Sequence, residues 1–300
     1  MRIADCGLRI DAGWVAGGVL ALLAAAVVVG PYVGGHKYSE RVGPALEAPD
    51  RSHWLGTDEL GRDELVRLLY AGRVSLAVGL AAAVAAAVVG TGVGLAAGTR
   101  GGWVDVVLMR VTDAFLAVPA LPVLLVLAAV DLEKPLAAIQ NALGVQDADL
   151  PRLAHEPWLH ALRLVGIVAL FGWMGTARLV RAQVLSLRQR EFVLAARALG
   201  VGGLRICFRH LLPHCLGPIL VATAGAVGGN ILYEAVLGFL GLGIPPPTPS
   251  WGGMLQDARV YSYYRAPWLI YFPGLCITLT VFCVNVLADR LQERGDPTRQ

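Results

Sequence analysis

The chain has 300 residues, of which 56% are hydrophobic and only 16% are charged. A soluble domain carries about a quarter charged residues, so the composition excludes an ordinary soluble protein and favours one with lipid as its solvent. The net charge of +3 is too small to indicate nucleic acid as a partner.

Apolar runs long enough for a membrane span recur along the chain. A helix needs about 20 apolar residues to cross the hydrocarbon core of a bilayer. The runs cover Ala12–Gly35, Val74–Thr99, Ala114–Val130, Trp158–Ala177, Leu216–Ile244 and Ala266–Ala288. The first run is longer than the apolar core of a signal peptide, so we expect an uncleaved span. The expected fold class is therefore an all-α polytopic membrane protein with about six transmembrane helices.

The segment before the second run has a helical pattern of its own. Asp58 is placed to cap a helix that starts directly after it, with Leu65 and Leu68 on one face. This pattern predicts an amphipathic helix at the outer membrane surface, and an ordinary solvated connector is the alternative. The chain then divides into an N-terminal unit, 1–73, with a cytoplasmic stub, the first span and this helix, and a core of five spans, 74–300.

Small residues in the second run predict how the spans pack. Gly90, Gly94 and Gly98 form a Gly-x-x-x-Gly-x-x-x-Gly pattern. Such a face lets two helix backbones approach closely in lipid. Either static packing or a face that slides during transport would explain the pattern.

Charged residues between the runs predict the orientation, because Arg and Lys concentrate in cytoplasmic loops. The segment Arg178–His214 contains seven Arg and one acid, whereas 131–157 contains five acids and two bases. Six alternating spans fit these charges when both termini are cytoplasmic. We therefore expect the segment 186–213 to lie on the inner side of the membrane.

Glu234 is the one formal charge deep within an expected span. An intramembrane carboxylate is costly and usually faces a cavity or a polar partner. Two roles remain open for Glu234, and for Asn230 one turn before it: a contact with another helix or subunit, or a direct part in translocation. A proton-coupled carrier would need more such groups, so the lone acid argues against that class.

Catalytic motifs are absent from the sequence. A phosphate-binding P-loop requires Gly-x-x-x-x-Gly-Lys followed by Ser or Thr, and neither Lys37 nor Lys134 lies in such a pattern. All six histidines lie in loops or at span ends, and the five cysteines lack zinc-ligand spacing. The sequence therefore predicts a non-catalytic chain that binds no metal and no cofactor of its own.

The inner segment reads Glu-Phe-Val-Leu-Ala-Ala-Arg-Ala-Leu-Gly from Glu191 to Gly200. Its composition favours a short helix, which Ser186 and Gln189 are placed to start as a capping box and Gly200 is placed to end in a left-handed cap. A second short helix, 204–212, follows and is expected to break at Pro213. The small side chains of Ala195 and Ala196 are expected to leave a flat surface that another protein can approach closely.

This segment resembles the EAA loop of permease subunits in binding-protein-dependent ABC importers. The shared pattern is an acid, three residues, Ala-Ala, three residues, Gly, and a later Leu-Pro. The resemblance implies a type I importer permease fold and a loop that inserts into a groove of a separate ATP-binding subunit. The residues it assigns to this contact are Glu191, Ala195, Ala196, Arg197 and Gly200.

Three further stretches resemble one branch of these permeases, the C-type subunits of dipeptide, oligopeptide and nickel importers. They are 53–76, before the second span, 230–255, through the fifth span, and Leu-Ala-Asp-Arg-Leu-Gln-Glu-Arg-Gly-Asp-Pro near the end. Departures from the pattern are the order Ala71-Gly72, which is reversed, Gly295 in place of a common Leu, and a long segment 131–157. The last departure leaves the transported solute open.

The resemblance implies a channel-forming subunit in a bacterial cytoplasmic membrane that imports short peptides, with nickel or a metal chelate as the alternative. Its implied partners are two ATP-binding subunits, which hold the ATP and Mg²⁺, a second permease, and a periplasmic or lipid-anchored solute-binding protein. Three other classes remain open: an ATP-independent secondary transporter or channel, an intramembrane enzyme and an exporter permease.

Overall fold

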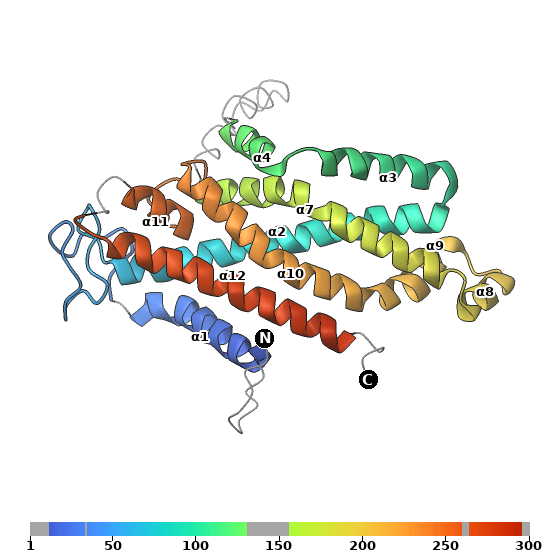
Figure 1. Cartoon of the computed structure of the whole chain (residues 1–300), viewed down its shortest axis with the longest axis horizontal. Coiled ribbons are helices and arrows are strands. Elements are labelled where there is room, and N and C mark those ends of the chain that lie inside the picture. Colours follow the sequence, from blue (N-terminus) through green and yellow to red (C-terminus); the bar gives the residue numbers. More distant parts are fainter. Residues whose placement is uncertain (1–11, 34, 131–155, 260–263, 296–300) are drawn as a thin grey trace, which may run out of the picture.

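A computed structural model describes residues 12–33, 35–130, 156–259 and 264–295. The extended regular elements in these ranges are helices, arranged as an elongated bundle (Figure 1). They are α1 (Ala12–Val33), α2 (Glu64–Arg100), α3 (Gly102–Ala117), α4 (Ala120–Ala129), α7 (Pro157–Leu187), α8 (Glu191–Ala198), α9 (Gly203–Ile206), the π turn η1 (Cys207–Leu211), α10 (Leu212–Phe239), α11 (Trp251–Ala258) and α12 (Trp268–Gly295). The expected all-α polytopic fold is confirmed. The cytoplasmic stub and nearly all of the long 131–157 segment lie outside the described residues.

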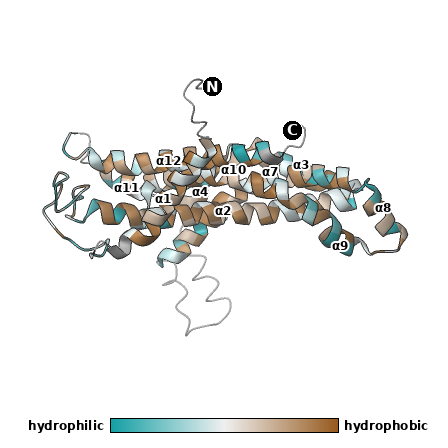
Figure 2. Ribbon diagram, turned by 90° about the horizontal axis from the view of Figure 1, so that it is seen from below, coloured by the Kyte–Doolittle hydropathy of each residue, from teal (hydrophilic) through white to brown (hydrophobic). Residues whose placement is uncertain are grey.

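Five stretches of the described chain are long and apolar enough to cross a membrane. They lie in α1, α2, α7, the continuous helical stretch Gly203–Phe239, and α12. Helices α3 and α4 are bent by 85° relative to each other, and this pair would count as a sixth span if the two helices cross the membrane together. Apolar residues run along the length of the bundle in Figure 2. Counted with the bent pair, the candidate spans of the described residues agree with the expected number of about six.

The third span begins earlier than expected and is broken in the middle. Helix α3 starts at Gly102 instead of Ala114, and Val118 and Pro119 separate it from α4. Proline disfavours a helical conformation in the residue before it, and Val118 is extended, with φ −84° and ψ 130°. Asp113 did not end the span because Arg178 of α7 forms an ion pair with it.

The expected separate amphipathic helix before the second span is wrong. Helix α2 begins at Glu64 and runs without a break for 37 residues, so position 73 is no boundary within it. Its cap is Asp63, whose side chain accepts a hydrogen bond from the Val66 N–H at 3.0 Å, and not Asp58. The charged groups of Asp58 are used instead in a buried cluster described below.

Glycines set the close packing of α2 on α7. A Cβ atom added at Gly90 would lie 2.4 Å from the carbonyl oxygen of Trp173, and one at Gly94 would lie 2.6 Å from that of Ala177. At Gly98 it would meet the side chain of Val184 at 2.7 Å. The pattern seen in the sequence is therefore a helix–helix contact face.

Helix α1 is held to α2 beside the reversed Ala71-Gly72 pair. Arg73 donates hydrogen bonds to the carbonyl oxygens of Val27 and Val28. A Cβ atom at Gly72 would lie 2.6 Å from a methyl group of Val27 and 2.9 Å from the ring of Trp251. Glycine is therefore required at position 72, where α1, α2 and α11 meet.

Candidate functional site

Helix α8 lies at one end of the bundle, far from α11 and the loops at the other end (Figure 1). It ends as predicted in a glycine cap, because Gly200 has a φ of +77°. The Gly200 N–H donates to the carbonyl of Arg197 at 2.9 Å, and the Val201 N–H donates to that of Ala196 at 3.1 Å. These two bonds are those of a Schellman motif, which fixes the direction of the chain after α8.

The expected capping box at the start of α8 is wrong. Ser186 lies within α7, and the Gln189 N–H donates to its backbone carbonyl at 3.3 Å. The residue before α8 is Arg190, whose side chain makes no capping hydrogen bond. Helix α7 extends ten residues beyond the expected end of the fourth span. Ser186, which was expected to cap α8, is therefore part of α7 itself.

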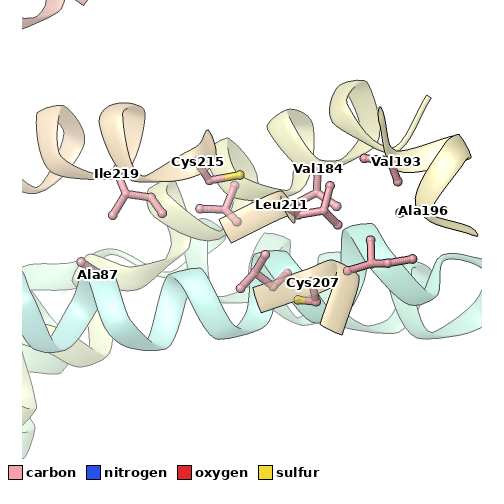
Figure 3. Packing of buried hydrophobic residues seen from close by; sticks show 11 residues of the cluster. Ala87, Val184, Val193, Ala196, Cys207, Leu211, Cys215 and Ile219 are labelled. Atoms are coloured by element: carbon pink, nitrogen blue, oxygen red, sulfur yellow. The ribbon is translucent and has the colours of Figure 1, made fainter. Parts of the chain in front are cut away.

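One face of α8 is packed into the bundle. Val193 is fully buried and Ala196 is 7% exposed, and both belong to one apolar cluster with Val184 of α7, Ile206 of α9 and Leu211 of η1. Figure 3 shows these side chains converging from different helices. Ala196 is thus an internal packing residue, and the expectation that it forms a flat outer surface is wrong in this structure.

The opposite face of α8 is exposed. Glu191, Ala195, Arg197 and the capping Gly200 are all exposed at this end of the molecule. Large apolar side chains surround them, since Leu194, Leu199 and Leu204 are 50%, 84% and 76% exposed. These leucines were not predicted from the sequence, although Leu199 and Leu204 stand just before and after the glycines of the turn.

Pro213 does not break the chain between the loop and the fifth span. Helix α9, η1 and α10 follow one another directly, and the Leu212 N–H donates to the carbonyl of Cys207 across the wide π turn. Proline lacks an N–H and is tolerated in the first turn of a helix, which is the place of Pro213 in α10. The segment after α8 is therefore joined to α10 without a loop.

The ring of Phe192 adds a second link between α8 and α10. It stacks on the imidazole of His214, with ring centroids 5.0 Å apart and planes inclined by 20°. His214 is held in place because its Nδ1 donates to the carbonyl of His210 at 2.7 Å. A displacement of α8 would thus be carried to the first turn of α10.

Glu234 is fully buried in the C-terminal half of α10, between α2 and α11. The hydroxyl groups of Ser75 and Ser250 interact with its carboxyl group, while no hydrogen bond of standard geometry reaches either carboxyl oxygen from the described residues. Asn230, one turn earlier, donates to the carbonyl of Gly79 on α2 at 3.5 Å. Both side chains therefore face helices of this same chain.

Helix α11 closes this polar site. Trp251 is 1% exposed; its Nε1 donates to the carbonyl of Leu68 and its backbone N–H donates to Ser75, both at 3.1 Å. A Cβ at Gly252 would lie 2.5 Å from the carbonyl of Ala235, so α11 touches the backbone of α10. The stretch 230–255, which carried part of the family resemblance, therefore contains the residues that pack α11 against α10.

A buried ionic cluster fixes the loop before α2 to α2 and α11. Asp58 accepts a hydrogen bond from Nε of Arg62 at 2.6 Å, and its other ion-pair partner is Arg67 at 3.3 Å. Arg67 is 4% exposed and also donates to Asp257 of α11 at 3.1 Å. Burial raises the pKa of the Asp257 carboxyl, and the nearby Arg67 opposes this effect. The stretch 53–76, which carried part of the family resemblance, thus builds a rigid cap over the α11 end of the bundle.

The profile of a protein family described as "Binding-protein-dependent transport system inner membrane component" matches residues 90–299. The match covers α8, its cap, Asn230 and Glu234. The chain belongs to this family. As a member, it is a multi-pass membrane permease component, in agreement with the helical bundle and its apolar spans.

Three relatives extend the likeness over most of the chain. The dipeptide transport system permease protein DppC of Alkalihalophilus pseudofirmus is 40% identical over 252 residues, which is 84% of this chain and 74% of the relative. The oligopeptide transport system permease protein OppC of Bacillus subtilis is 36% identical over 254 residues, 84% and 74%. DppC of Bacillus subtilis is 34% identical over 280 residues, 93% and 79%. The resemblance to the dipeptide and oligopeptide branch is confirmed.

Proposed function

We propose that this permease forms half of the channel of an ATP-driven importer for di- or oligopeptides. The observation that carries the proposal is the 40% identity to a dipeptide permease across 84% of the chain. Its partners would be a second permease, two ATP-binding subunits and a solute-binding protein that is periplasmic or lipid-anchored. ATP and Mg²⁺ would be held by the ATP-binding subunits, since this sequence has no P-loop.

The exposed face of α8 is the proposed contact with an ATP-binding subunit. Glu191, Ala195 and Arg197 would meet the partner together with Leu199 at the glycine turn. Because Val193 and Ala196 anchor α8 in the bundle, a movement of the partner would be passed to α7 and α10. Such a rigid link lets ATP binding favour one of two arrangements of the spans.

The Glu234 site has a different proposed role. Glu234 and Asn230 face α2 and α11 within the chain, so we assign them to holding the outer half of α10 in place during transport. The Arg-rich end with α8 would lie in the cytoplasm, together with both termini.

Substitution at Ala195 tests the coupling contact. Ala195→Leu enlarges an exposed side chain, so the fold of this chain should be unchanged. The larger side chain should prevent the ATP-binding subunit from approaching α8 closely. Overpacking costs about 1–3 kcal/mol, which corresponds to a roughly 5-fold to 150-fold weaker association with the ATP-binding subunit. The measurements are co-purification of that subunit and uptake of a labelled dipeptide by cells with the full transporter.

Ala182→Leu is the matched control, because Ala182 is exposed on α7 and lies outside the proposed contact. Membrane insertion should be equal for both variants and the parent. Unchanged uptake and co-purification in Ala195→Leu would refute the contact. Uptake of nickel that excess dipeptide does not inhibit would refute the assigned solute.

A further inference from the structure

Two apolar grooves flank the half of α2 nearest α8. One lies between α2 and the α9–α10 segment and has a volume of about 820 Å³. The other lies between α2 and α3 and has a volume of about 600 Å³. Both volumes fall in the range of pockets that hold a small molecule.

One ridge on α2 separates the two grooves. It consists of Gly92, Ala96 and Arg100, which line both grooves and are spaced by four residues. A Cβ atom added at Gly92 would meet no described atom within 4 Å, in contrast to Gly94, which packs on α7. The ridge rises about 12 Å along the helix, close to the roughly 15 Å of hydrocarbon in one leaflet.

The ridge ends at a cation without a counter-charge. Arg100 is exposed, and its side chain makes no hydrogen bond or ion pair with any residue that the structure describes. The acids of neighbouring α3 are engaged, since Asp105 accepts a hydrogen bond from Arg181 at 2.6 Å and Asp113 pairs with Arg178. The grooves therefore open toward an uncompensated positive charge.

Two further side chains mark this end as a membrane surface. Trp103 lines the second groove and is 77% exposed, in the way tryptophan sits at the level of lipid headgroups. Arg188 lies nearby and donates to the carbonyl of Gly98 at 3.3 Å, which adds positive charge beside Arg100. The phosphate of a lipid at this level would be attracted by Arg100 and Arg188, and its acyl chains would contact the apolar grooves.

We propose that an anionic phospholipid straddles the ridge, with its phosphate on Arg100 and one acyl chain in each groove. A protein helix is about 10 Å wide, so one helix lying on the ridge would have to fill both grooves at once. The two acyl chains of a phospholipid can instead lie on opposite sides of the ridge, one in each groove. The proposal takes the cytoplasmic orientation of this end from the proposed function.

Lipid retention by the purified full chain tests the proposal. In native mass spectrometry with added phosphatidylglycerol or phosphatidylcholine, the parent should keep one phosphatidylglycerol under conditions that remove phosphatidylcholine. Arg100→Gln should lower this retention about fivefold, the effect of one basic residue on anionic lipid. Arg110→Gln is the matched control, because Arg110 is also exposed but lines neither groove.

A second pair of variants tests the grooves themselves. Gly92→Leu places a side chain into the open space shared by both grooves and should remove the bound lipid. Gly166→Leu enlarges another glycine with open space, on α7, and should leave it bound. Equal retention of phosphatidylcholine, equal loss in Arg100→Gln and Arg110→Gln, or retention in Gly92→Leu would each overturn the site.

The assembled transporter provides a further test, with Gly92→Cys as a cross-linking position. Cross-linking to a photoreactive phospholipid is expected, and cross-linking to the second permease would overturn the proposal in favour of a protein interface. Lipid retention needs no transported solute. A chain that keeps the lipid but imports no peptide would therefore refute only the proposed function.

Discussion

The carboxyl group of Glu234 lies among hydrogen-bonding groups that three helices of the chain enclose. Ser75 accepts the backbone N–H of Trp251, and Ser250 accepts that of Gly253 at 3.2 Å, which leaves the hydrogen of each hydroxyl free to point at the carboxyl. No cation is recorded beside Glu234 in the described residues. The site thus offers hydrogen bonds but no charge partner.

The first prediction concerns Glu234→Gln and Glu234→Leu. The amide keeps an acceptor for the two hydroxyls, so Glu234→Gln should unfold near the parent temperature. Leucine leaves the hydrogen of each buried hydroxyl without an acceptor, at about 1–3 kcal/mol for each group, and should lower the unfolding midpoint by several degrees. Thermal unfolding of the chain in detergent, followed with a thiol-reactive dye, measures both.

Equal losses in the two variants would contradict this interpretation, because the charge itself would then be required. A stable Glu234→Gln variant that fails to import peptide would return Glu234 to a direct role in translocation. The two measurements therefore separate the alternatives that the sequence left open.

Single residues differ in how far the sequence determines their role. The left-handed cap at Gly200 was predictable, because a glycine directly after a helix-forming segment commonly adopts the left-handed conformation that ends a helix. The burial of Ala196 was not, because Ala195 and Ala196 are chemically identical and only tertiary packing separates them. Asp58 was assigned to a helix start for a similar reason, because the local rule for caps does not show that its carboxylate is instead shared by Arg62 and Arg67 in a buried cluster.

At the scale of the helix, apolar runs predicted the spans but not their ends. Charges were expected to end a span, yet α3 contains Asp105 and Asp113, each neutralised by an arginine of α7. Proline acted in two ways, since Pro119 breaks the third span while Pro213 lies in the first turn of a helix. The difference depends on hydrogen bonds of neighbouring turns, which the residue type does not specify.

The second prediction tests the Schellman cap as the element that holds α8. Gly200→Ala places a side chain at a φ of +77°, at a cost of about 1–2 kcal/mol. Opening of α8 should become roughly 5- to 30-fold more frequent, because a factor of this size follows from that free energy. Hydrogen–deuterium exchange of the α8 amides measures the opening.

Gly202→Ala serves as the control in the same turn. Gly202 has a φ of −62°, which alanine adopts without strain, and a Cβ there meets no described atom within 4 Å. Its exchange should stay at or below that of the parent. If the two variants exchange alike, the cap does not hold α8 and the rigid link to α10 has to be sought elsewhere, for example in the Phe192–His214 stack.

At the scale of the whole molecule, the two ends of the bundle have different chemistry. At the end near α11, the charges of Asp58, Arg62, Arg67 and Asp257 are paired with one another. The end near α8 has exposed arginines, including Arg190, Arg197 and Arg205, in a segment with one acid. Unpaired positive charge favours the cytoplasmic side of a membrane, and the proposed orientation rests on this difference between the two ends.

The last prediction tests this orientation, on which both proposals depend. In a chain whose native cysteines are replaced by serine or alanine, Leu199→Cys and Trp54→Cys each introduce one thiol at a side chain that is 84% or 70% exposed. A membrane-impermeant maleimide added to intact spheroplasts should label only the cysteine at position 54. The cysteine at position 199 should react only after permeabilisation, because α8 is proposed to lie in the cytoplasm. Labelling of position 199 in intact spheroplasts would place α8 where no ATP-binding subunit can reach it.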